Sequence, residues 1–201
     1  MDSRKLHRFP LLAFVALLIL TASGCSSNTG LVAGKMDPRT SVTITYIQSP
    51  MIFYRDVSGR AAYARDFVYV APIEINRSGT YHYYLWLGIW NTMEDARPDL
   101  ARDGFESLVV FVDGEPLPLE IAGWTPQSIG ASEPVYLKPV ASAADAYYEV
   151  TVNQLNRIAE ATDIRLQSTE PKRGSYEPWD DQKAARSGLI KFLDASVYWV
   201  D

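Results

Sequence analysis

The sequence predicts a mainly β fold: an antiparallel, sandwich-like single domain over residues 41–201 with two short helices. Three observations support this prediction. Apolar and polar residues alternate with a period of two in several stretches, which is typical of strands with one buried face. Short runs of turn-forming residues lie between neighbouring stretches and would join them into hairpins. Apolar residues recur at helical spacing near residues 153–162 and again near 185–193. We find no internal repeat and no second linker, so we expect one domain.

The first strands are predicted over residues 41–46 and 51–57, with Pro50 between them. The clearest hairpin joins residues 67–75 to residues 80–92 through the turn Asn76-Arg77-Ser78-Gly79. Pro72 lies inside its first strand and has no N–H to donate, so this side of the strand should face an open edge or a bulge.

A second hairpin is predicted from residues 108–112 and 117–121, joined by Asp113-Gly114. N–H groups point to alternate sides along a strand. Pro116 and Pro118 therefore remove donors from one side only, and we expect residues 117–121 to form an edge strand that pairs on its other side.

The last third of the chain is predicted to mix strands and helices. Residues 147–152 form a strand, residues 153–162 a helix that begins at the capping box of Thr151 and Gln154, and residues 164–168 another strand. After a polar loop, Asp180 or Asp181 caps a last helix. The side chains expected on the buried face of that helix are Ala185, Gly188, Leu189, Phe192 and Leu193. The apolar tail over 197–200 should pack against the domain.

The N-terminus has the pattern of a secretory signal. Arg4, Lys5 and Arg8 precede an unbroken apolar run over residues 11–20, and small residues lead into Cys25. The apolar run is too short for a transmembrane helix, because crossing the hydrocarbon takes roughly 20 apolar residues.

The segment Ala22-Ser23-Gly24-Cys25 resembles the lipobox of bacterial lipoproteins. The resemblance implies that residues 1–24 are a signal peptide, that Cys25 is acylated, and that its acyl chains hold the protein in a membrane. Residues 25–40 would then be the lipidated N-terminus and a flexible tether. Ser26 and Ser27 stand where an aspartate retains related proteins in the inner membrane, which implies an outer-membrane protein facing the periplasm. The rest of the chain is similar only in general character to uncharacterised envelope lipoproteins of proteobacteria, and no functional residue is carried over.

Composition excludes several classes of function. Without residues 1–24, 177 residues remain with 16 Lys and Arg against 23 Asp and Glu, a net charge of −7, so nucleic acid is a poor partner. Cys25 is the only cysteine, which leaves no thiol for catalysis once it is lipidated. No phosphate-binding glycine loop and no serine-hydrolase motif occurs, and we expect no cofactor.

Residues 93–104 hold several carboxylates, but neighbouring arginines compete for them, so we expect a solvated loop and no metal. Asp180 and Asp181 beside Trp179 come nearest to a catalytic carboxylate pair, although helix capping explains them equally well.

The most informative stretch is residues 81–90, whose two strand faces are both substantially apolar. We expect the odd-numbered face to be core, because it carries fewer polar groups in need of partners. The members of that face are Tyr81, Tyr83, Leu85, Leu87 and Ile89. The even-numbered face holds His82, Tyr84, Trp86 and Trp90. It is either a second layer covered by Leu189 and Phe192 of the last helix or by Trp199, or an open aromatic groove, with Gly88 leaving space in it.

These features predict a non-enzymatic, membrane-anchored envelope lipoprotein that acts through contacts with a partner protein. The alternative is a glycan- or peptide-binding module that uses His82, Tyr84, Trp86 and Trp90. A more distant alternative is a hydrolase.

Overall fold

The computed structural model describes residues 30–57, 63–93, 102–169 and 174–197. The chain divides into two compact units, residues 1–30 and Leu31–Asp201, and every helix and strand described below belongs to the second.

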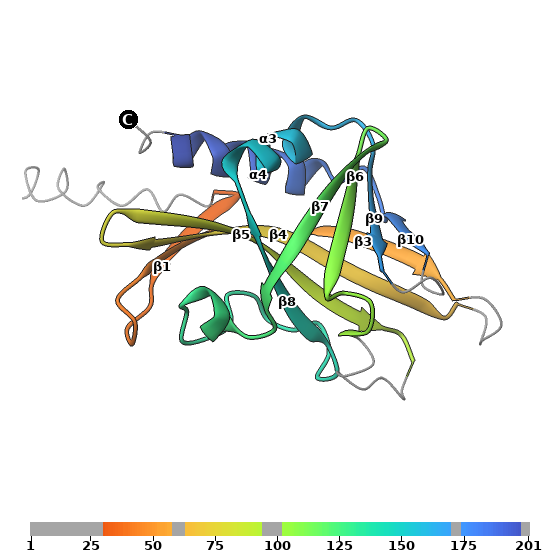
Figure 1. Cartoon of the computed structure of the whole chain (residues 1–201), viewed down its shortest axis with the longest axis horizontal. Coiled ribbons are helices and arrows are strands. Elements are labelled where there is room, and N and C mark those ends of the chain that lie inside the picture. Colours follow the sequence, from red (N-terminus) through yellow and green to blue (C-terminus); the bar gives the residue numbers. More distant parts are fainter. Residues whose placement is uncertain (1–29, 58–62, 94–101, 170–173, 198–201) are drawn as a thin grey trace, which may run out of the picture. The chain divides into compact units, whose positions relative to one another are not determined.

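Ten antiparallel strands occur in the described part of the chain (Figure 1). They are β1 (Val32–Met36), β2 (Thr43–Ile47), β3 (Met51–Asp56), β4 (Arg65–Arg77), β5 (Thr80–Asn91), β6 (Ser107–Val112), β7 (Glu115–Gly123), β8 (Ala144–Val150), β9 (Ile164–Ser168) and β10 (Ser175–Pro178).

Eight of these strands close into a ring, in the order β4-β3-β10-β9-β6-β7-β8-β5 and back to β4. The mainly β prediction is therefore confirmed, but the sandwich is wrong: the domain is a closed eight-stranded antiparallel barrel. The pairing that closes it is between β4 and β5, which run side by side from Arg77↔Thr80 to Asp66↔Asn91. β2 and then β1 extend the sheet beyond the ring.

The other edge of β4 is shared by two strands. β2 pairs with it as far as Ile73, and β3 takes over from Val70. Pro72 lies at this break, and its carbonyl accepts a 3.3 Å hydrogen bond from the hydroxyl of Tyr136, which also donates to the Ile47 carbonyl at the end of β2. The missing N–H of Pro72 therefore falls where neither strand pairs, as its position in the sequence predicted.

Both predicted hairpins are confirmed, and each has a two-residue turn with positive φ. Ser78 and Gly79 have φ of 51° and 92°, and Asp113 and Gly114 have 51° and 87°. Such turns match the twist of the flanking strands and so fix their register.

Over most of its length, β7 pairs on one side only, as the positions of Pro116 and Pro118 predicted. From Glu115 to Glu120, β7 pairs only with β6. β8 joins at Ile121 and Gly123, just beyond Pro116 and Pro118. The predicted edge strand is therefore wrong in one respect, because the last residues of β7 pair with β8 inside a closed ring.

Two short strands were not predicted from the sequence. Residues 32–36, expected to belong to a flexible tether, form β1 against β2. Residues 175–178, expected to be loop, form β10 between β3 and β9. β1 has no clean polar and apolar alternation, and β10 makes only two pairs on each side, so neither shows the period-two signal.

The barrel interior is filled by side chains from every strand of the ring. Even-numbered residues of β4 and odd-numbered residues of β5 point inward, so the odd-numbered face of β5 is core, as predicted. The largest fully buried interior side chains include Phe53, Leu85, Phe105, Tyr148 and Tyr176. Arg55 and Asp66 form an ion pair among them, with Nη2 2.5 Å from Oδ2 and the guanidinium carbon 5.6 Å from the Tyr176 ring centre.

Two helices follow the predicted boundaries to within two residues, as far as those were stated. α3 (Val152–Glu160) begins at the capping box of Thr151 and Gln154, and α4 (Lys183–Val197) buries the whole predicted apolar face. The carboxylates of Asp180 and Asp181 accept the N–H of Gln182 and Lys183. A hydrogen bond links the two helices: Nη1 of Arg186 in α4 donates to the carbonyl of Ala161, the residue that caps the C-terminus of α3, at 2.5 Å. The predicted packing of the tail at 197–200 concerns side chains outside the described residues.

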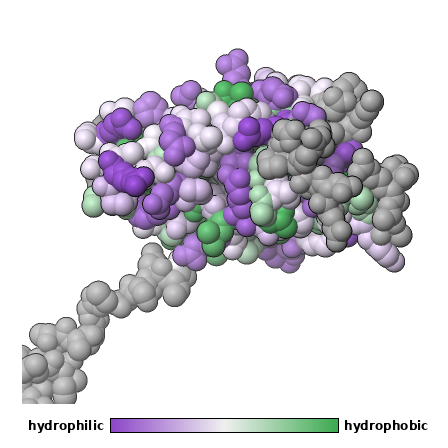
Figure 2. All heavy atoms as spheres, turned by 90° about the horizontal axis from the view of Figure 1, so that it is seen from below, coloured by the Kyte–Doolittle hydropathy of each residue, from purple (hydrophilic) through white to green (hydrophobic). Residues whose placement is uncertain are grey.

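The face of the molecule shown in Figure 2 is mostly polar. On this face, apolar residues occur as small separate patches among hydrophilic ones.

The loop over residues 124–143 lies on the outside of the barrel, and besides Tyr136 one carboxylate fastens it. Asp37, buried just after β1, accepts hydrogen bonds from the backbone N–H and the hydroxyl of Ser132 at 2.6 and 2.8 Å. It also accepts the N–H of Arg39 and of Thr40. The N–H of Ser132, followed by these other donors, holds the pKa of Asp37 well below its ordinary value, despite the opposing effect of burial.

We expect Asp37→Asn to lower the unfolding midpoint at pH 7. Because the folded state depresses this pKa, the carboxylate stabilises the fold fully above the unfolded-state value of 3.8, and the contribution declines as the pH falls below it. Urea titrations of both proteins at pH 7 and at pH 3 measure this. The difference between them should shrink at pH 3; an equal or larger difference at pH 3 contradicts the role of the charge.

Candidate functional site

The four residues of the even-numbered face of β5 do not form one site. They lie in three different environments along the outside of the barrel: Trp86 is covered, Trp90 belongs to a cluster of aromatic rings, and His82 and Tyr84 line a surface hollow. The second-layer expectation therefore holds for Trp86 alone.

Trp86 is fully buried, with 1% of its surface exposed. Its ring stacks on Tyr136 of the 124–143 loop at 4.3 Å between centres, and its Nε1 donates to Asp145 at 3.0 Å. The expected cover was the last helix or Trp199 of the tail. The prediction of the helix is wrong, because Phe192 of α4 packs against Tyr83, on the opposite face of β5. Trp199 lies outside the described residues.

The space left by Gly88 is filled by the Trp86 ring itself. A Cβ at Gly88 would lie 2.7 Å from two ring carbons of Trp86. Neither a ligand nor another element therefore occupies this space, and Trp86 gives the glycan-binding alternative no support.

Trp90 is half-buried and lies in an outer aromatic cluster of five residues from β3, β4, β5 and the end of β10. They are Tyr54, Phe67, Tyr69, Trp90 and Trp179. Tyr54 and Phe67 are directly opposite each other, and Phe67 is opposite Trp90, so three rings cross three adjacent strands in one row. Phe67 and Trp90 stack at 4.6 Å with 15° between their planes.

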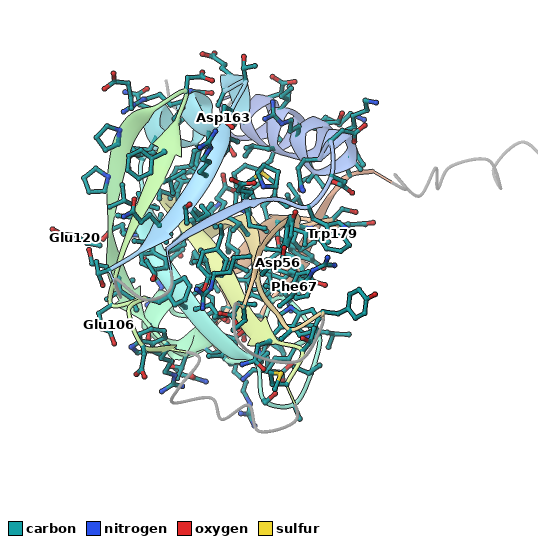
Figure 3. All side chains as sticks on the ribbon, turned by 90° about the vertical axis from the view of Figure 1, so that its right-hand side faces the viewer. Asp56, Phe67, Glu106, Glu120, Asp163 and Trp179 are labelled. Carbon is teal, nitrogen blue, oxygen red and sulfur yellow. The ribbon has the colours of Figure 1, made fainter. Side chains whose placement is uncertain are left out.

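Trp179 is the most exposed member of this cluster, at 44%. Its ring meets Tyr54 edge-on at 5.1 Å and Phe67 at 5.5 Å. Figure 3 shows Phe67 and Trp179 close together beside Asp56, on the opposite side of that view from Glu106 and Glu120. Ring pairs of this kind contribute about 0.5–1.5 kcal/mol each beyond their burial, so the cluster is held in a defined shape.

Arg65 places a positive charge against the cluster. Its guanidinium carbon lies 5.0 Å from the Trp179 ring centre and 5.4 Å from that of Tyr54. Its Nε donates to Asp56 at 2.9 Å. The cluster thus combines flat aromatic surface with a guanidinium and a carboxylate at its edge.

His82 and Tyr84 lie at the other end of the same outer face. With Arg77 and residues of the 124–143 loop they line a hollow of about 350 Å³. Burial raises the pKa of Tyr84 above its ordinary value, Glu149 adds to the shift, and Arg77 opposes it.

Hydrolase chemistry gains no support from the described residues. No hydrogen bond within them links His82 to a serine or a carboxylate, and no group of three or more His, Cys, Asp and Glu side chains there is placed to hold a metal ion. Asp180 and Asp181 accept backbone N–H groups at the start of α4, which accounts for both. The loop at 93–104, where we expect no metal, lies mostly outside the described residues, and Cys25 lies outside them.

Four members of the aromatic cluster were not predicted from the sequence to belong to a site. Tyr54, Phe67 and Tyr69 belong to predicted strands, and their outward alternation was visible. The pairing of β4 with β5 aligns Phe67 with Trp90, but the alignment of Tyr54 depends on how β3 pairs with β4. Trp179 follows a strand too short to detect.

Comparisons with known protein families, with curated proteins and with solved structures give no match. Among the residues that the structure describes, none of the helices is long and apolar enough to cross a membrane.

We expect Gly88→Ala to destabilise the domain by about 1–3 kcal/mol, because the new methyl group would displace the Trp86 ring. Urea denaturation measures this. The control is Gly34→Ala, also in a strand, where the nearest atom to an added Cβ is 3.9 Å away. Equal stabilities of the two variants would show that Trp86 moves aside without cost.

Proposed function

We propose that this protein is an outer-membrane lipoprotein, anchored through acyl chains on Cys25, whose barrel faces the periplasm and binds a partner protein without catalysing a reaction. The observation that carries the binding role is the outer aromatic cluster, with Trp179 exposed and Arg65 against it.

The composition of the cluster favours a protein partner. Residues that dominate the energy of protein interfaces are enriched in Trp, Tyr and Arg, and the cluster with Arg65 combines all three types. Its members also have a fixed arrangement, since three of them are aligned across neighbouring strands. Binding would therefore cost little conformational entropy in the rings, which favours affinity.

A glycan is the alternative ligand for the same surface. Trp179 offers an exposed ring, and Arg65 and Asp56 offer hydrogen-bonding groups beside it. The apolar C–H faces of sugars could stack on that ring while their hydroxyls bond to the charged groups. This alternative now depends on Trp90 and Trp179, because Trp86 is covered.

Acylation of Cys25 is tested by mass spectrometry of the membrane-extracted protein. We expect an N-terminal peptide that begins at Cys25 and carries acyl chains, and Cys25→Ser should leave the membrane fraction. Two acyl chains or more are needed for permanent attachment, since each buried methylene adds about 0.8 kcal/mol. A mature N-terminus at any other residue, or a Cys25→Ser variant that stays with membranes, would refute the anchor.

The binding role is tested by photo-crosslinking in intact envelopes from a site beside the cluster. Trp179→Ala should reduce the yield of the cross-linked partner at least tenfold, because it removes the most exposed ring. Ile190→Ala, a change at a 50% exposed residue on α4, is the matched control and should leave the yield unchanged.

Co-sedimentation with purified peptidoglycan distinguishes the alternative. If Trp179→Ala abolishes sedimentation with the polymer but leaves protein cross-links intact, the ligand is a glycan and the protein-contact proposal fails. Cross-links that persist in Trp179→Ala and disappear in Ile190→Ala would place the interface elsewhere.

A further inference from the structure

A second candidate site is the hollow at the tip of the β4–β5 hairpin, here called the hairpin hollow. Strand residues form one wall and the 124–143 loop forms the other. Its lining residues are Ile75, Arg77, Thr80, His82, Tyr84, Ser128, Ile129 and Gly130. It lies about ten residues of β4 away from Phe67, which is roughly 30 Å at 3.3 Å per residue, so it is separate from the aromatic cluster.

The charge of the hairpin hollow is opposite to that of the protein. The chain beyond residue 24 carries a net charge of −7, yet Arg77 and His82 line this hollow and no carboxylate does. Glu149 is opposite Tyr84 across β5 and β8 and its charge acts on Tyr84, but Glu149 lines a different hollow with Gln154. The guanidinium of Arg77 therefore faces a hollow whose lining residues include no acid.

Arg77 has no partner within the described residues. Other arginines do: Arg65 pairs with Asp56, Arg165 with Asp163, and Arg186 donates to the Ala161 carbonyl. Within the described residues Arg77 forms neither an ion pair nor a hydrogen bond, although its charge acts on Tyr84. Its Nη2 lies 2.8 Å from the point that a Cβ would take at Gly130. Gly130, at φ of 81°, thus makes room for the guanidinium against the loop.

Hydrogen-bonding groups approach the hollow from three sides. Arg77 and Thr80 flank the hairpin turn, His82 and Tyr84 come from β5, and Ser128 comes from the loop. An arginine can give two parallel hydrogen bonds to an oxyanion, and hydroxyls and an imidazole can supply more. The number of donors exceeds what the two oxygens of a carboxylate require and suits the larger number of oxygens on a phosphate.

We propose that the hairpin hollow binds a phosphate ester. Arg77 holds the phosphoryl oxygens from one side, and His82 and the hydroxyl of Thr80 hold them from the other. The organic part contacts Ile75 and Ile129. A volume of about 350 Å³ exceeds what a phosphate group alone needs and is at the small end of the range for ligand sites.

The test follows His82 by proton NMR in the purified full-length protein in neutral detergent, with its ring signals identified by their loss in His82→Asn. Glycerol phosphate at constant ionic strength should shift these signals in a saturable manner. Arg77→Ala should weaken the binding at least tenfold, and Arg77→Lys should fall between, because it keeps the charge and loses the two parallel bonds. Arg165→Ala is the matched control: it removes an arginine from another surface hollow and should leave the binding unchanged.

Further arms separate the sources of the phosphate. Binding to glycerol phosphate alone indicates a soluble ester, whereas stronger, Arg77-dependent binding to phosphatidic acid in mixed micelles indicates a lipid headgroup. Equal shifts with acetate, an Arg165→Ala effect as large as that of Arg77→Ala, or no saturable shift with either phosphate would overturn the proposal. None of these outcomes depends on the aromatic cluster, so the partner-binding proposal stands or falls separately.

Discussion

The long pairing between β4 and β5 is the interaction on which the rest of the barrel depends. It runs the length of both strands, and β4 then offers its other edge to β2 and β3 in succession. Every other strand of the ring is reached from this hairpin, either through β3 or through β8. The same pairing sets which side chains face inward. It therefore points Leu85 and Leu87 into the barrel interior and Trp86 and Trp90 to the outer side of the barrel wall.

The outer face of this hairpin shows how one strand serves three purposes. In the middle, the 124–143 loop covers Trp86 with Tyr136, and Asp37 fastens that loop from the β1 side. At one end the loop is absent and the rings around Trp90 are left partly exposed. At the other end the loop leaves a hollow beside His82. The coverage by one loop, and not the strand sequence, decides which aromatic residues can meet a ligand.

Local signals in the sequence were sufficient for much of the fold. Asp113-Gly114 can adopt positive φ cheaply, so it defined its hairpin, and Thr151 with Gln154 defined the start of α3. Features that depend on distant contacts were not predictable. Nothing near Trp86 shows that Tyr136, 50 residues away, covers it, and the row from Tyr54 to Trp90 exists only once three strands are in register. The site could therefore not be predicted from the sequence, although Tyr54, Phe67, Tyr69 and Trp90 are ordinary members of predicted strands.

The barrel differs from a sandwich only at two places, here called seams, where few residue pairs join the neighbouring strands. β10 makes two residue pairs with each of its neighbours, and β7 meets β8 at only Ile121 and Gly123. Between these seams lie two stiff sheets, one built on β3, β4, β5 and β8 and the other on β6, β7 and β9. Backbone N–H groups along the seams should exchange with solvent through small openings, while those of β4 and β5 require global unfolding. We therefore expect the two sheets to separate locally at one of these short pairings while the other pairing keeps the strands in register.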